Sequence, residues 1–204
     1  MRHILFGDSI GFGVGDYHNG GWATQLRLLI DRDKKAKNNN LINLSIAGDT
    51  SRHLLARMEK EAKLRIRDKD SSEFRFLIAI GANDARVDKV DANNNISPAE
   101  FRQNIGNIIQ IAKQLSKELV LIGLLPVDES LITPYKEEKY YFNEQLKKYN
   151  QILKEIAEEQ KLNFVNMFEE WTKKDWPTLL DDGLHPNTSG HQLIFEAVKS
   201  ELFK

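Results

Sequence analysis

A serine follows the first apolar segment of the chain, in the sequence Gly7-Asp8-Ser9. A serine hydroxyl is a weak nucleophile, and it attacks a carbonyl group only when a neighbouring base takes its proton. A serine that follows a glycine at the end of a strand is also a common turn residue or helix cap. Ser9 considered alone therefore leaves a catalytic and a structural interpretation open.

The histidine best placed to serve as that base is His185, on a loop just before the last predicted helix. The chain has five histidines, and the other four fall in the first predicted strand, a glycine-rich loop and predicted helices: His3, His18, His53 and His191. Asp182 precedes His185 by three residues, and Gly183 and Pro186 favour a tight turn there. Its carboxylate could orient the imidazole toward a serine. An Asx-turn that caps the helix would use the same aspartate.

Acyl transfer also requires hydrogen-bond donors where negative charge develops on the substrate's carbonyl oxygen. Gly48 offers a backbone N–H that no side chain crowds, Asn83 offers a side-chain amide, and Ser9 offers its own N–H. Each of these residues is equally typical of an ordinary turn. Taken together with the nucleophile, the base and the orienting acid, they form a complete set for acyl transfer.

The elements that must position these residues are short apolar runs alternating with longer amphipathic segments. Near-continuous apolar runs indicate strands buried on both faces of a sheet, and they occupy residues 3–7, 41–45, 74–80, 119–125 and, more weakly, 163–165. Apolar residues at helical spacing predict helices over residues 22–31, 50–67, 98–115, 139–160 and 188–203. Ser97, Pro98 and Glu100 together predict a capping box at the start of the third helix.

This alternation predicts an α/β fold, a three-layer α/β/α sandwich with a flavodoxin-like, five-stranded parallel sheet. Residues 1–204 are expected to form one domain with a single substantial core. In such a sheet, ligands bind beyond the carboxyl ends of the strands. The loops that hold Ser9, Gly48, Asn83 and His185 are therefore expected at one edge of the sheet.

The same residues carry a resemblance to a known family. Gly7-Asp8-Ser9-Ile10, Gly48, Gly81-Ala82-Asn83-Asp84 and Asp182-Gly183-Leu184-His185-Pro186 resemble the four blocks of the SGNH or GDSL hydrolases, in that family's order. Each block is short, but four in register are specific. Ile10 replaces the leucine of the name-giving motif, a change that is expected to alter only packing.

The resemblance implies the flavodoxin-like fold and hydrolysis of carboxylic esters or thioesters without a metal or other cofactor. It implies Ser9 as nucleophile, His185 as base and Asp182 as the partner of that base. The oxyanion hole would consist of the Ser9 and Gly48 amides and the Asn83 side chain. The mechanism that we expect is acyl transfer through an acyl-enzyme.

Two other motifs are matched in part. Residues 7–11 satisfy Gly-x-Ser-x-Gly, the nucleophile elbow of α/β-hydrolases, but only one predicted strand precedes Ser9. The acid and base of that fold also come from separate loops. The glycines at positions 11, 13 and 15 suggest a dinucleotide-binding loop, yet Asp16 stands where that fingerprint needs glycine.

Two further functions remain as alternatives. A metal-dependent hydrolase could gather Asp8, Asp49, Asp84 and Asp182 around Mg²⁺, because carboxylates suit a hard cation. That interpretation leaves Ser9 and His185 without roles, and sensitivity to EDTA would separate the two mechanisms. A non-catalytic binding module on the same fold would require a damaged constellation, whereas every member is present here.

Composition excludes several other classes. The 29 Lys and Arg residues nearly balance the 30 Asp and Glu residues, so nothing favours nucleic acid as a partner. Cysteine is absent, which excludes disulfides and thiolate chemistry. No apolar run approaches the length of a membrane span, and no apolar stretch precedes the first strand. A cytoplasmic location is therefore expected, and the oligomeric state is left open.

The substrate is expected to be a small-molecule ester. Residues 126–141 and the Gly20-Gly21-Trp22 loop are the expected pocket walls, with Tyr135, Tyr140 and Tyr141 as candidate lining side chains. Trp22 is equally interpreted as the first core residue of its helix. Nothing in the sequence chooses among lipid esters, thioesters and acetylated sugars.

Overall fold

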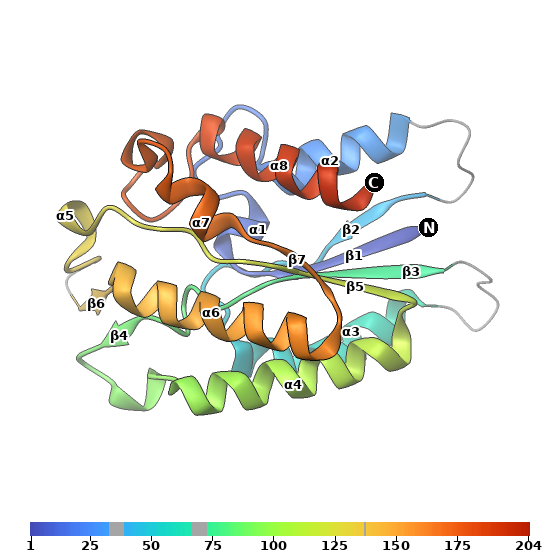
Figure 1. The fold of residues 1–204 in the computed structure, drawn as a ribbon, viewed down its shortest axis with the longest axis horizontal. Helices are drawn as coiled ribbons and strands as arrows, with labels where there is room; N and C mark the ends of the chain where they lie inside the picture. The colour runs from blue at the N-terminus through green and yellow to red at the C-terminus, as the bar shows by residue number, and fades with distance from the viewer. Residues whose placement is uncertain (33–38, 67–72, 137) are drawn as a thin grey trace.

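The computed structural model describes residues 1–32, 39–66, 73–136 and 138–204, and its centre is a five-stranded sheet. All its pairings are parallel, in the order β2-β1-β3-β5-β7. The strands are β1 (Arg2–Gly7), β2 (Leu41–Asn43), β3 (Phe74–Ala79), β5 (Glu118–Ile122) and β7 (Asn163–Val165). Helices cover both faces (Figure 1). This arrangement confirms the predicted flavodoxin-like sandwich.

Each strand contributes to two cores, because successive side chains of a strand point to opposite faces. In β1, Ile4 and Phe6 pack in the core beneath one face, whereas Leu5 packs in the other. The first core is closed by α3 (Ser51–Arg65), α4 (Pro98–Leu115) and α6 (Asn143–Gln160). The second is closed by α2 (Trp22–Arg32), α7 (Met167–Thr172) and α8 (Thr188–Leu202). Because both faces of the sheet are buried, the strands are continuous apolar runs in the sequence.

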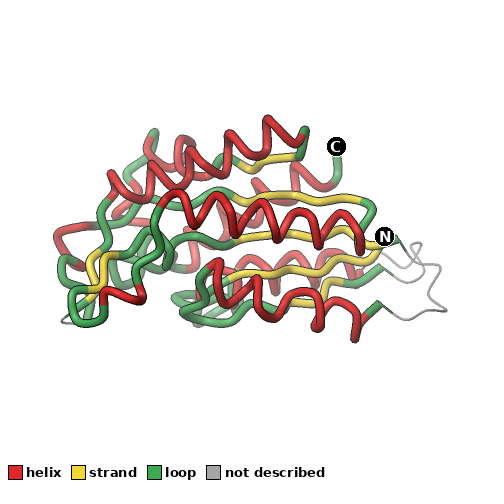
Figure 2. The backbone as a smooth tube through the Cα atoms, turned by 90° about the horizontal axis from the view of Figure 1, so that it is seen from below, coloured by secondary structure: helices red, strands yellow, loops and turns green. Residues whose placement is uncertain are grey.

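The shorter elements belong to the connections between strands and helices. Viewed from below, most of the loops gather beyond the end of the strands that lies opposite the N-terminus (Figure 2). The short elements are α1 (Ser9–Phe12), β4 (Val87–Asp88), α5 (Glu129–Ile132), β6 (Lys139–Tyr140) and the 3₁₀ turns Ala92–Asn94 and Trp176–Leu179. No helix among the described residues is long and apolar enough to cross a membrane.

Three local predictions need correction. The helix predicted from residue 139 begins at Asn143, because Lys139–Tyr140 pairs as β6 with β4 in a two-stranded antiparallel sheet. The strand predicted to reach residue 125 ends at Ile122, and beyond it the Leu124 N–H donates to the Asn150 side chain at 2.9 Å rather than to a neighbouring strand. The helix predicted to end at residue 67 is observed to Arg65, and residue 67 lies outside the described residues.

The capping box predicted for α4 forms only in part. Ser97 Oγ accepts a hydrogen bond from Glu100 N at 3.2 Å, as the motif predicts. The Glu100 carboxylate does not reach back to the cap, because it pairs with the Arg52 guanidinium of α3 instead. A bidentate partner of opposite charge outcompetes a single backbone amide.

Candidate active site

Ser9 is the first residue of α1, in the turn that follows β1. Asp8 caps this short helix by accepting a hydrogen bond from Ile10 N at 3.0 Å. The turn is held tightly: a Cβ on Gly7 or Gly11 would approach Ser45 Oγ to 2.8 or 2.5 Å. Close packing of Gly7 and Gly11 on Ser45 therefore helps to hold the turn that carries Ser9 beyond the carboxyl end of the sheet.

The imidazole of His185 connects Ser9 to Asp182. His185 Nε2 lies 3.0 Å from Ser9 Oγ, and His185 Nδ1 lies 2.8 Å from Asp182 Oδ2. The other carboxylate oxygen of Asp182 accepts hydrogen bonds from the backbone amides of Leu184 and His185. One oxygen of Asp182 thus forms a local turn and the other contacts the imidazole. Asp182 does not cap α8, however, because the N-cap of that helix is Asn187, whose side chain accepts from Gly190 N at 3.1 Å.

The pKa of Asp182 reflects these contacts. Partial burial raises the pKa of the carboxyl, but the hydrogen bonds from the His185 ring and backbone outweigh it and hold the pKa well below its usual range. The carboxylate is therefore charged at neutral pH. It keeps the proton of the imidazole on Nδ1, which leaves Nε2 free to accept the Ser9 proton.

A second histidine, His191, connects α8, the helix that follows His185, to the segment that follows Ser9. Its Nδ1 accepts a hydrogen bond from Trp22 N at 3.2 Å, so its proton resides on Nε2. That nitrogen lies 2.9 Å from the carbonyl oxygen of Val14, to which it donates. Burial lowers the pKa of His191, which keeps the ring neutral. No pattern in the sequence indicates this role, because His191 simply falls within a predicted helix.

The Asp182–His185 turn also packs directly on the loop after α1. A Cβ on Gly15 would lie 2.2 Å from the carbonyl oxygen of Pro186 and 3.3 Å from His185 Cβ. Thr188 Oγ1 donates to Asp16 Oδ1 at 2.8 Å beside this contact. Backbone contact and hydrogen bonds together hold the imidazole at its distance from Ser9.

The three predicted oxyanion donors lie along one cleft with Ser9 and His185. Gly48 has φ +87°, a left-handed conformation that favours glycine even though a Cβ would meet nothing within 4 Å. The amides of Ser9 and Gly48 donate to no acceptor that the described part of the chain provides. Asn83 is buried, and its Nδ2 donates to the Asp49 carbonyl at 3.0 Å.

The cleft has a volume of about 480 Å³, which suits a small-molecule ligand. Part of the predicted wall at residues 126–141 lines it, through Tyr135, Lys136, Lys139 and Tyr141. Residue 137 of that wall lies outside the described residues. The Tyr135 hydroxyl lies 3.3 Å from Asp182 Oδ2, and the Tyr141 hydroxyl donates to Asn83 Oδ1.

Two other expected wall elements lie elsewhere. Tyr140 does not line the cleft, because its ring stacks on Phe142 while Lys89 lies over it. The Gly20-Gly21-Trp22 loop does not line it either. Trp22 is 1 % exposed and packs in the core between α2 and the sheet, where its apolar surface is fully removed from water.

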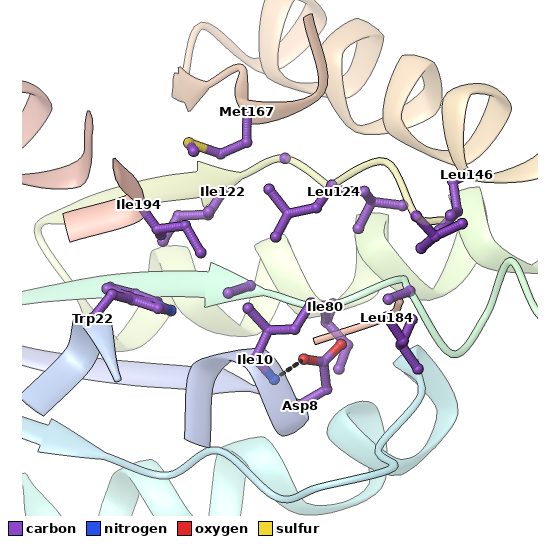
Figure 3. Close-up of a pocket in the computed structure, with 15 residues that line it drawn as sticks. Asp8, Ile10, Trp22, Ile80, Ile122, Leu124, Leu146, Met167, Leu184 and Ile194 are labelled. Atoms are coloured by element: carbon purple, nitrogen blue, oxygen red, sulfur yellow. Dashed lines mark hydrogen bonds between the residues drawn. The ribbon is translucent and has the colours of Figure 1, made fainter. Parts of the chain in front are cut away.

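A second, narrow apolar cavity adjoins the cleft and shares Leu184 with it. Its volume is about 30 Å³. Figure 3 shows Asp8 in this cavity among the side chains of Ile10, Ile80 and Leu184, with one carboxylate oxygen bound to Ile10 N. Asp8 is thus a buried carboxyl in largely apolar surroundings.

Because of this environment, the protonation of Asp8 is expected to make the stability of the fold depend on pH. Burial raises the pKa of Asp8 to about 7, from 3.8 when it is exposed. Between those values the folded protein keeps a proton that the unfolded chain has lost, so this contribution to stability is complete below about pH 4 and is lost as pH rises through 7. Asp8→Asn, which keeps the acceptor for Ile10 N, removes that loss.

Urea unfolding at pH 5 and pH 8 measures the effect. The free energy of unfolding of Asp8→Asn, relative to that of wild type, is expected to be higher at pH 8 than at pH 5. The increase is on the order of 2–3 kcal/mol, at about 1.4 kcal/mol per pKa unit. Titration of the other carboxyls cancels in this comparison. A difference between the two proteins that is the same at both pH values would contradict the assignment.

The four aspartates of the metal alternative are each engaged separately. Asp84 accepts from Ser51 N and Oγ, Asp49 pairs with Arg57 at 2.8 Å, and Asp182 binds His185. Within the described ranges, no group of three or more His, Asp or Glu side chains gathers closely enough to hold a metal ion. Asp49 and Asp84 thus position the loops that carry them.

Known proteins resemble this chain in sequence and in fold. Residues 5–193 match the model of the GDSL-like Lipase/Acylhydrolase family. The chain is 26 % identical to an arylesterase of Vibrio mimicus, over 98 % of this chain and 88 % of the relative. It is 24 % identical to thioesterase 1/protease 1/lysophospholipase L1 of Escherichia coli K12, over 98 % of this chain and 82 % of the relative.

A solved structure shares the fold. Axe2, an acetylxylan esterase from Geobacillus stearothermophilus, superposes with a TM-score of 0.78 and 21 % identity, over 100 % of this chain and 94 % of that one. The family match extends from β1 into α8 and therefore spans every block that the sequence singled out. The chain belongs to the GDSL-like lipase/acylhydrolase family and is an ester-hydrolysing enzyme.

Proposed function

We propose that this enzyme cleaves carboxylic esters by a two-step acyl transfer with Ser9 as nucleophile. The observation that carries the proposal is the hydrogen-bonded line from Ser9 Oγ through His185 to Asp182, at 3.0 and 2.8 Å. A hydroxyl, a base and an orienting carboxylate in this order are the arrangement that activates serine. The line opens into a cleft beside the Ser9 and Gly48 amides, which donate to no acceptor among the described residues.

In the first step, Ser9 Oγ bonds to the ester's carbonyl carbon while His185 Nε2 takes its proton. The negative carbonyl oxygen is stabilised by the amides of Ser9 and Gly48 and by the Asn83 side chain. The carbon–oxygen bond to the leaving alcohol then breaks, and His185 returns the proton to that alcohol. The acyl group remains on Ser9.

In the second step, water attacks the acyl-enzyme after giving a proton to His185. The bond to Ser9 breaks, Ser9 regains the proton, and the carboxylic acid leaves. Asp182 stays ionised throughout and stabilises the imidazolium that forms twice in each cycle. A thioester would follow the same steps with a thiol as leaving group.

A fluorophosphonate probe and a series of p-nitrophenyl esters from acetyl to palmitoyl test this proposal. We expect the probe to label Ser9, as read by peptide mass spectrometry, and to abolish turnover in proportion to labelling. The chain-length profile then reports which acyl groups the cleft accepts. Turnover that survives complete labelling, or that EDTA removes, would count against the serine mechanism.

The oxyanion role of Asn83 gives a separate prediction. Asn83→Ala removes one donor, which is expected to lower kcat by about 10²–10³-fold with a much smaller change in KM. Initial rates on p-nitrophenyl acetate measure both constants. Thermal unfolding of the variant checks that the fold is retained, since Asn83 also holds the Asp49 carbonyl. A kcat within a factor of two of wild type would remove Asn83 from the oxyanion hole.

We further propose that residues 1–204 act as one domain, with the whole cleft built from this chain. The relatives named above act on aryl esters, thioesters, lysophospholipids or acetylated xylan by their names. A small ester is the substrate class proposed for this chain, and the ester series selects within it. A cytoplasmic location stays a prediction from the sequence.

A further inference from the structure

We propose that Tyr141 is a positioning residue that fixes the side-chain amide of Asn83 with its N–H group toward the substrate's carbonyl oxygen. This inference rests on the proposed oxyanion role of Asn83. Two hydrogen bonds support this role. Asn83 Nδ2 donates to the Asp49 carbonyl, and the Tyr141 hydroxyl donates to Asn83 Oδ1, each at 3.0 Å.

These two bonds determine which way the amide faces. The Asp49 carbonyl oxygen can only accept, so the amide nitrogen must lie beside it. The oxygen of the amide then lies beside Tyr141, and the hydroxyl must donate to it. An amide turned over would place two acceptors together at Asp49. Tyr141 therefore contributes to a single orientation in which the nitrogen's second N–H is left for a ligand in the cleft.

Burial strengthens the constraint. Tyr141 is 2 % exposed and Asn83 is 7 % exposed, so water competes little for either group. Burial also raises the pKa of Tyr141 to about 12, against an opposing effect of the Arg86 guanidinium. The hydroxyl thus keeps its proton at neutral pH and remains a donor.

The small sheet β4–β6 explains how Tyr141 reaches this position. Val87 pairs with Tyr140 in antiparallel register. Val87 ends the loop that starts at Asn83, and Tyr140 immediately precedes Tyr141. The pairing therefore binds the segment that carries the tyrosine to the loop that carries the amide. A sheet of two residues per strand adds little stability by itself, but it sets this register.

Arg86 extends the arrangement with a positive charge. Its side chain is 11 % exposed, it lines the cleft, and Asp88 is 3.8 Å from its guanidinium. The guanidinium acts on the Tyr141 hydroxyl by lowering its pKa, and a cation with this effect makes the hydroxyl a stronger donor. Through Asn83 Oδ1, the polarisation strengthens the amide N–H that faces the cleft. Arg86 is thus expected to act in the same direction as Tyr141.

Tyr141→Phe tests the inference, because phenylalanine keeps the ring and its edge-to-face packing on Tyr135. Loss of one neutral hydrogen bond predicts a fall in kcat of roughly 5- to 10-fold, with KM almost unchanged. The affinity for a boronic acid, which mimics the tetrahedral intermediate, is expected to fall by the same factor. Tyr140→Phe is the matched control and leaves both values unchanged, since that ring lies outside the cleft.

A double-mutant cycle distinguishes positioning from a general structural effect. In an Asn83→Ala background, Tyr141→Phe has nothing left to orient, so its effect on kcat is expected to vanish. Arg86→Met is a second variant, with a smaller loss of kcat that also vanishes in that background. Equal losses in both backgrounds, or no loss in wild type, would overturn the inference. If Asn83→Ala itself left kcat intact, the proposed oxyanion role would be what fails.

Discussion

Ser9→Ala is expected to lower kcat by roughly 10⁴-fold or more, because it removes the atom that forms the acyl-enzyme. His185→Ala is expected to cost a similar factor, since Ser9 Oγ then has no base at the 3.0 Å position that the imidazole occupies. The double variant should be hardly slower than either single one, because the two residues act as a unit. Rates on p-nitrophenyl acetate, with protein free of wild-type contamination, measure all three.

The control for this series is Ser200→Ala, on the exposed side of α8, which keeps full activity and full labelling by a fluorophosphonate. Unchanged melting temperatures show that the variants are folded. Multiplication of the two single losses in the double variant would mean that Ser9 and His185 act independently. Wild-type turnover by Ser9→Ala would disprove the serine mechanism altogether.

Asp182→Asn is expected to be nearly as damaging, although it changes only one atom. The Oδ1 position of Asp182 accepts from two backbone amides, at Leu184 and His185, so an asparagine must place its oxygen there. Its NH₂ group then faces His185 Nδ1, which can only accept from it. The imidazole proton moves to Nε2, and that nitrogen can no longer take the proton of Ser9. A loss of kcat on the order of 10⁴-fold is expected.

Asp181→Asn is the matched control for charge, because it removes a carboxylate from the same loop without touching the imidazole. It is expected to change kcat by less than about twofold, in line with the small effects of exposed charges. The tautomer itself is visible by ¹⁵N NMR of the histidine ring. An Asp182→Asn protein that keeps its Nδ1–H tautomer, or its activity, would refute this reasoning.

The sequence predicted most of the fold because the strands are buried on both faces. Ile4, Leu5 and Phe6 read as one apolar run, since neighbouring side chains pack into different cores. The predicted sheet and the confirmed family follow from such local patterns. The loops that carry Ser9, Gly48, Asn83 and His185 follow from the rule that ligands bind beyond the carboxyl ends of parallel strands.

What the sequence could not predict depends on contacts between distant segments. The pairing of β4 with β6 involves two residues a strand, too few for any period to show. The predicted helix therefore included Lys139 and Tyr140, and Tyr141 was only one of several candidate residues for the pocket wall. The roles of His191 and Gly15 depend on Val14, Trp22 and Pro186, which no local pattern links to them.

The separation of Ser9 and His185 by 176 residues has a consequence for folding during synthesis. Ser9 is synthesised long before His185, and under the proposed mechanism it can contact that histidine only after α8 has emerged and His191 has bound Val14 and the backbone of Trp22. A nascent chain that ends before α8 is therefore expected to lack esterase activity. The time at which esterase activity appears during synthesis or refolding therefore reports when α8 docks on the segment that follows Ser9.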